Sequence, residues 1–148
     1  MNFRELLKAW LPVIVWMAIM FIGSTDLMSA EHTSRFLTPF LHWLKPDISP
    51  ATVAHIHFLL RKGAHVTEYA ILTALIFRAL RGLTNRLWWR VALALFPALL
   101  FAAADEFHQS FVASRTSSLG DVIIDSGGVI VGLVLCLLFL FFQRRSTG

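Results

Sequence analysis

Two short stretches of the sequence place acidic, basic and hydrogen-bonding side chains at helical spacing. In the first, RKGAHVTEYAIL, Lys62, His65 and Tyr69 are three and four residues apart and Glu68 lies beside them, so they form one stripe of a helix. A histidine with a carboxylate nearby can act as a general base, which makes His65 and Glu68 candidate catalytic residues. The alternative is a packing network in which the same side chains hydrogen-bond to neighbouring helices.

The second stretch, ADEFHQSFVASRTSSLGDVIID, begins with two adjacent carboxylates. Asp105 and Gln109 are one helical turn apart, and Glu106 follows Asp105 directly. Neighbouring carboxylates repel, so one of them must hold a proton, pair with a base or help to bind a cation. Arg115 is the only lysine or arginine in the stretch, and its planar fork suits a carboxylate or a phosphate. We expect Arg115 to be the partner of these acids, and Asp105 to be a further candidate catalytic residue beside His65.

The end of the second stretch leads into an apolar helix that carries acids and glycines on one stripe. Asp121, Asp125, Gly128 and Gly132 follow one another at intervals of four, three and four residues, which place them on one face of a helix. The glycines, with Gly127, let another helix approach closely, so the pattern predicts a polar pocket above a tightly packed region. A structural alternative for Asp121 is a favourable position near the helix N-terminus.

A divalent cation is one way to accommodate so many carboxylates. The candidate metal ligands are Asp105, Glu106, Asp121 and Asp125, since carboxylate oxygens bind hard divalent ions. The sequence contains no H-E-x-x-H zinc pattern, phosphate-binding loop or nucleophile elbow. The sequence therefore leaves the cofactor unknown.

The composition indicates which elements position these side chains. The 148-residue chain is 57% hydrophobic and 15% charged, with a mean hydropathy of +0.68, which is typical of an integral membrane protein. Its apolar runs cover residues 9–23, 64–80, 87–104 and 122–142, each long enough, or nearly so, to cross a bilayer. We predict an all-α membrane bundle of about four transmembrane helices, forming a single domain over residues 1–148.

Basic residues are concentrated at one set of helix ends. Arg4 and Lys8 precede the first run, and Arg144 and Arg145 follow the fourth. The arginines grouped with the short connection between the second and third runs are Arg78, Arg81, Arg86 and Arg90. Because lysine and arginine are retained on the cytoplasmic side, we expect a multi-pass protein of the cell membrane with both termini in the cytoplasm. The positive charge then needs no nucleic-acid partner, and the two polar stretches lie at the outer face.

The long connection after the first run contains a further helical pattern. An apolar stripe is formed by Phe36, Phe40, Leu41, Trp43 and Leu44. Such a stripe fits an interfacial helix on the outer leaflet, although packing on top of the bundle would use the same residues. After this segment, Ser49 is expected to cap a helix that begins at Pro50.

The two polar stretches together resemble the VanZ-like membrane protein family. The patterns are K-x-x-H-x-x-E-Y-x-x-L and D-E-x-x-Q…R…D-x-x-x-[ND]-x-x-G. They match Lys62, His65, Glu68, Tyr69 and Leu72, and then Asp105, Glu106, Gln109, Arg115, Asp121, Asp125 and Gly128. Ala113 and Ser114 stand where the family often has Pro-Gly before the arginine. The family takes its name from a protein associated with resistance to the glycopeptide teicoplanin, so the resemblance implies a role in the cell envelope.

Two classes of function fit these observations. In the first, the matched polar residues bind the head group of a lipid-linked cell-wall precursor or an amphiphilic glycopeptide, with Lys62 and Arg115 meeting anionic oxygens. In the second, a membrane-embedded hydrolase or transferase uses His65 with Glu68 or Asp105 on a lipid-linked phosphate or glycan. We favour binding, because no recognised catalytic motif is present in the sequence.

Overall fold

The computed structural model describes residues 2–23, 30–111 and 119–146, and its regular secondary structure there is entirely helical. The elements are α1 (Phe3–Gly23), α2 (Ala30–Leu44), α3 (Pro50–Ala79), the 3-10 turn η2 (Leu80–Gly82), α4 (Leu87–Gln109) and α5 (Leu119–Ser146). The predicted all-α fold is therefore confirmed.

Three of the helices, α1, α4 and α5, are long and apolar enough to cross a membrane. The longest helix, α3, contains all but the last residue of the run 64–80 but is not among them. Polar side chains such as His65 and Glu68 lower the mean hydropathy of α3. Such side chains are costly to place in lipid unless they face protein or water. The fourth span stays a prediction.

The start of α3 follows the expected capping pattern. Ser49 is the N-cap, its hydroxyl accepts a hydrogen bond from the Thr52 amide at 3.1 Å, and Pro50 occupies the first helical position. The Ser49 hydroxyl satisfies one backbone amide of the first turn, and Pro50 has no amide hydrogen that would need a partner. The helix then continues without interruption to Ala79. It thus includes residues 50–63, which lie between the first two apolar runs of the sequence.

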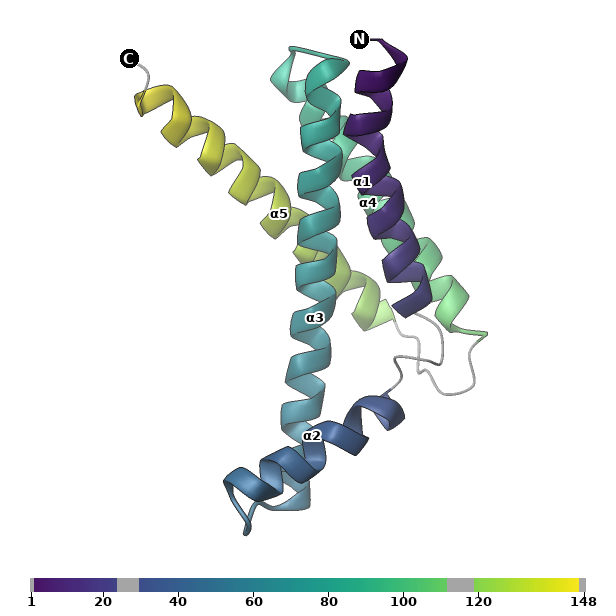
Figure 1. Ribbon diagram of the computed structural model, residues 1–148, viewed down its shortest axis with the longest axis vertical. Coiled ribbons are helices and arrows are strands. Elements are labelled where there is room, and N and C mark those ends of the chain that lie inside the picture. Colours follow the sequence, from purple (N-terminus) through teal and green to yellow (C-terminus); the bar gives the residue numbers. More distant parts are fainter. Residues whose placement is uncertain (1, 24–29, 112–118, 147–148) are drawn as a thin grey trace.

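Figure 1 shows α3 as the central helix of the bundle, in contact with α1, α2, α4 and α5. Both chain termini and the α3 to α4 connection lie at one end of the molecule, while α2 crosses the start of α3 at the opposite end. The helix α5 leans away from the others towards its C-terminus. We refer to the end that carries the termini as the terminal end.

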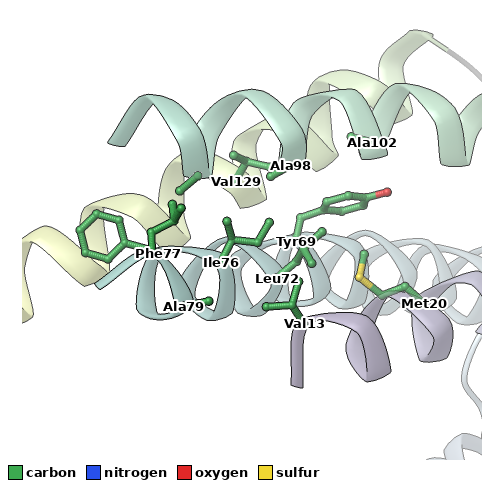
Figure 2. Close-up of a cluster of buried hydrophobic side chains, with 12 residues drawn as sticks. Val13, Met20, Tyr69, Leu72, Ile76, Phe77, Ala79, Ala98, Ala102 and Val129 are labelled. Carbon is green, nitrogen blue, oxygen red and sulfur yellow. The ribbon is translucent and has the colours of Figure 1, made fainter. Parts of the chain in front are cut away.

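The apolar core is formed between α3 and the helices around it (Figure 2). Leu72 and Ile76 of α3 are buried there, as is Val129 of α5. On α4, three buried alanines follow one another at four-residue intervals, at positions 94, 98 and 102. Their small side chains leave room for the larger side chains of α3.

Two glycines bring α5 into direct contact with the backbone of α3. A Cβ atom added at Gly128 would lie 2.5 Å from the Val66 carbonyl oxygen, and one added at Gly132 would lie 2.7 Å from the Ala70 Cα. Both distances are too short for real side chains. The predicted close approach of another helix is therefore confirmed at Gly128 and Gly132 but not at Gly127, where no atom lies within 4 Å of an added Cβ.

Most of the apolar stripe of α2 is exposed, and only Leu41 of its five residues is partly buried. Phe36 and Trp43 are 82% and 77% exposed, and Phe40 and Leu44 are exposed as well. On the other side of α2, the Thr38 hydroxyl lies 3.1 Å from His57 Nε2 of α3. Packing of the whole stripe on the bundle is thus contradicted, while contact of α2 with lipid remains a prediction.

Candidate functional site

Polar side chains of α3, α4 and α5 are linked to one another near the start of α5 and the end of α4. We call this group the polar cluster. It consists of Lys62, His65 and Tyr69 on α3, Asp105, Glu106 and Gln109 on α4, and Asp121 and Asp125 on α5. All eight residues were predicted as site residues, so the structure brings most of the predicted site together.

Two pairs of oppositely charged or hydrogen-bonding side chains join α3 to α5. Lys62 Nζ forms an ion pair with Asp121 Oδ1, and both side chains keep about 15% of their surface exposed. One helical turn further along both helices, His65 Nδ1 lies 3.0 Å from Asp125 Oδ1. The Asp125 side chain is fully buried, so this second pair lies deeper in the bundle than the first.

The position of Asp121 agrees with the structural alternative drawn from the sequence. Asp121 lies within the first turn of α5. A carboxylate in the first turn still benefits from the positive end of the helix dipole. Its ion pair with Lys62 nevertheless gives Asp121 a tertiary role that the dipole alone does not explain.

A second set of hydrogen bonds joins α3 to α4 through Asp105. The Tyr69 hydroxyl donates to Asp105 Oδ2 at 3.3 Å, and Gln109 Nε2 donates to the same oxygen at 3.1 Å. All three side chains are buried. Figure 2 shows the Tyr69 ring at the end of the apolar core beside Ala102, so Tyr69 connects the core to the polar cluster.

The third feature of the cluster is a group of possible metal ligands. Nitrogen or oxygen atoms of His65, Glu106 and Asp125 lie within 4.8 Å of one another. Glu106 and Asp125 were predicted as metal candidates, but His65 was considered only as a catalytic or ligand-binding residue. Within the described part of the chain, Asp105 and Asp121 are not members of this group, because their carboxylates are directed to Tyr69 and Lys62.

Two predicted site residues are not placed in the cluster by these contacts. The Glu68 backbone carbonyl accepts a hydrogen bond from Trp16 Nε1 of α1 at 3.0 Å, and its carboxylate is not in the group formed by His65, Glu106 and Asp125. Arg115 lies in the segment 112–118, outside the described residues. Their roles stay predictions from the sequence.

A buried arginine at the terminal end was not anticipated as a packed residue. Arg90 was grouped with the basic connection, but it lies inside α4 and only 9% of its surface is exposed. Its guanidinium lies 4.1 Å from the centre of the Phe77 ring and donates to the Phe77 carbonyl at 3.2 Å. The planar cation can stack on an aromatic ring, which no spacing rule in the sequence reveals.

The cluster offers three kinds of chemistry within a small region. The Lys62 ammonium can meet an anionic oxygen, and the carboxylates can accept hydrogen bonds from hydroxyl or amine groups. The contact with buried Asp125 orients the His65 ring for proton transfer or metal binding. Polar groups at this depth are expensive in a membrane protein and commonly mark functional sites.

Comparison with known proteins agrees with these observations. A family model described as VanZ/LLP1 matches residues 9–141, which include every residue of the polar cluster. No curated protein and no solved structure matches the chain. The family match extends over more than half of the chain and agrees with the resemblance seen in its two polar stretches. The chain therefore belongs to the VanZ/LLP1 family.

Proposed function

We propose that this membrane protein binds the polar head group of an envelope amphiphile through its polar cluster. The observation that carries the proposal is the partial exposure of the Lys62 and Asp121 side chains beside the buried groups of the same cluster. A purely structural network would be expected to be closed on all sides. Here the Lys62 ammonium and the Asp121 carboxylate remain partly accessible at the edge of the cluster. Each can give up its contact with the other and contact a ligand instead.

The chemistry of the cluster fits a head group that is both anionic and rich in hydroxyl or amide groups. Lys62 would contact a phosphate oxygen, since ammonium groups bind phosphate as point charges. Asp121 and the deeper carboxylates would accept hydrogen bonds from the donors of the head group. A lipid-linked cell-wall precursor has this composition, and we take it as the first candidate, with an amphiphilic glycopeptide of the teicoplanin type as the second.

The proposal also requires the cluster to face the outside of the cell. Support comes from the basic residues, because Arg4, Lys8, Arg144 and Arg145 belong to the chain ends that share the terminal end of the molecule (Figure 1). The positive-inside rule places that end in the cytoplasm. A reporter fused after Gly148 is expected to be cytoplasmic and a tag at Asp47 to be accessible from outside; the reverse labelling would contradict the proposal.

Binding can be measured with purified full-length protein in detergent. Tryptophan fluorescence or native mass spectrometry would be followed during titration with a polyprenyl-pyrophosphate-linked cell-wall precursor and, separately, with teicoplanin. We expect saturable binding of at least one probe, weakened about tenfold by Lys62→Gln through loss of one charged contact. The control is Lys45→Gln, since Lys45 is an exposed lysine between α2 and α3. Equal binding by both variants, or no saturable binding, would refute the proposed role of the cluster.

Arg115 allows a second test of anion recognition based on the sequence motif. If its planar fork grips the ligand, Arg115→Lys keeps the charge but lowers affinity for the same probes. If it only supplies positive charge, Arg115→Lys binds like the parent, and only Arg115→Ala loses affinity. Envelope-antibiotic susceptibility of cells that carry each variant would show whether the binding is used in resistance.

An enzymatic function is the second candidate, and the contact between His65 and Asp125 favours it. A histidine oriented by a buried carboxylate can remove a proton from an attacking water or hydroxyl, and Glu106 lies close enough to take part. The reaction would be hydrolysis or transfer on a lipid-linked phosphate or glycan. Turnover of the precursor by purified protein, abolished by His65→Ala, would establish this function in place of simple binding.

A further inference from the structure

We propose that His65, Glu106 and Asp125 form a binding site for a divalent transition-metal ion, with Zn²⁺ as the ion that fits best. The three residues come from α3, α4 and α5, and their ligand atoms lie within 4.8 Å of one another. The site thus differs from the four-carboxylate set suggested by the sequence. It includes a histidine and leaves out Asp105 and Asp121.

The geometry is close to that of a metal centre. Zinc is about 2.0 to 2.2 Å from nitrogen and oxygen ligands in a tetrahedral arrangement, so two of its ligands lie about 3.4 Å apart. His65 Nδ1 and Asp125 Oδ1 are separated by 3.0 Å. No pair of ligand atoms is more than 4.8 Å apart, so the widest pair needs to close by at most about 1.4 Å, which rotation of the Glu106 side chain can supply.

Burial supplies an independent reason for a cation at this position. Asp125 is 0% exposed and Glu106 is 4% exposed, so two carboxylates lie close together out of water. Asp125 Oδ2 is buried and accepts no hydrogen bond from any residue in the described ranges. A buried carboxylate oxygen without a partner is costly, and a metal ion between the carboxylates would neutralise both. Lys62 is already paired with Asp121.

The ligand types point to the class of metal. Imidazole suits Zn²⁺ and other first-row transition ions, whereas Mg²⁺ and Ca²⁺ favour oxygen ligands alone. Three protein ligands leave at least one coordination position open for water or a ligand oxygen. His65 retains 14% of its side-chain surface, which gives the ion a route of entry. Lys62 and Asp121 lie one helical turn away, where they can contact the rest of a phosphate group bound to the metal.

The biological use of the metal rests on the proposed function, but its binding does not. Zn²⁺ alone would be titrated into chelator-treated, full-length protein in detergent by isothermal calorimetry. We expect one Zn²⁺ per chain, no competition from Mg²⁺, and at least about tenfold weaker binding for His65→Gln and for Asp125→Asn, since even outer-shell changes cost this much. His57→Gln is the matched control, because His57 lies on the same helix outside the site.

Several outcomes would overturn the inference. The first two are absence of stoichiometric Zn²⁺ binding and preference for Mg²⁺. The third is a loss of Zn²⁺ affinity in Asp121→Asn but not in His65→Gln, which would indicate the four-carboxylate ligand set. If the substituted proteins do not fold, pulsed electron paramagnetic resonance of Mn²⁺ bound to the parent protein decides. We expect coupling to an imidazole nitrogen, and its absence refutes the site. If Zn²⁺ does not bind but the lipid precursor binds saturably, the metal site is rejected and the proposed function is not.

Discussion

The central helix α3 meets α5 and α1 through two different kinds of contact. Towards α5, glycines at positions 128 and 132 lie against the α3 backbone, and two polar pairs occupy successive turns. Towards α1, the contact consists of side chains such as Val13 and Met20, together with two hydrogen bonds from side chains to backbone carbonyls, Trp16 to Glu68 and Arg78 to Ala9. The two sides of the same helix are therefore packed by backbone contact on one side and by side-chain filling on the other.

The difference indicates where the structure tolerates change. Backbone atoms cannot move apart without separating both polar pairs, so the α3–α5 contact fixes the distance and the register of the two helices. Flexible aliphatic side chains can repack in several ways. We therefore expect substitutions on the α5 side to have larger effects on the free energy of unfolding than comparable substitutions on the α1 side.

The largest effect is expected for Gly132→Ala. The new methyl group would meet the Ala70 backbone, so the free energy of unfolding should fall by about 3 kcal/mol, the upper range for overpacking. Gly127→Ala is the control, because nothing lies within 4 Å of its added Cβ. Thermal unfolding in detergent measures both, and similar stabilities of the two variants would show that α5 is not held in backbone contact.

The next largest effect is expected for Asp125→Ala, which removes the partner of His65 at a fully buried position. Loss of one member of a buried hydrogen bond should cost about 2 kcal/mol. Asp125→Asn keeps an acceptor oxygen and should cost less. A double-mutant cycle with His65→Ala measures the coupling, and purely additive effects would mean that the two side chains do not interact.

A smaller effect is expected for Lys62→Met, because the Lys62 and Asp121 side chains are only partly buried. The loss should be about 1 kcal/mol at low salt and less at high salt, since ions screen accessible charges. Unfolding would be followed at both salt concentrations, with Lys45→Met as the exposed control. A loss that does not change with salt would indicate that packing of the lysine stem, not its charge, stabilises this edge of the cluster.

The smallest effect is expected on the α1 side, for Met20→Leu. Met20 is buried against α3, but leucine has a similar volume, so the free energy of unfolding should change by about 0.5 kcal/mol. The same unfolding assay applies. A loss as large as that of Gly132→Ala would remove the distinction between the two sides of α3.

The sequence by itself determined the helical, membrane-type character of the protein and the stripes on which its polar residues lie. Apolar runs of spanning length predict helices that cross a bilayer, and three such helices are present. Local rules also predicted the cap of α3 at Ser49 and the close contact at Gly128 and Gly132. These features depend on residues a few positions apart, where backbone geometry alone relates one side chain to the next.

Only the tertiary structure decided which stripes face each other. His65 is beside Glu68 in the sequence, yet its hydrogen-bond partner is Asp125, sixty residues away on α5. Helical spacing shows which residues share a face but not which helix packs against that face. Arg90 illustrates the same limit, because its contact with Phe77 depends on the crossing of α3 and α4. Which helices pair depends on how well the surfaces of both helices fit together. A sequence pattern describes one face of one helix and does not identify the partner face.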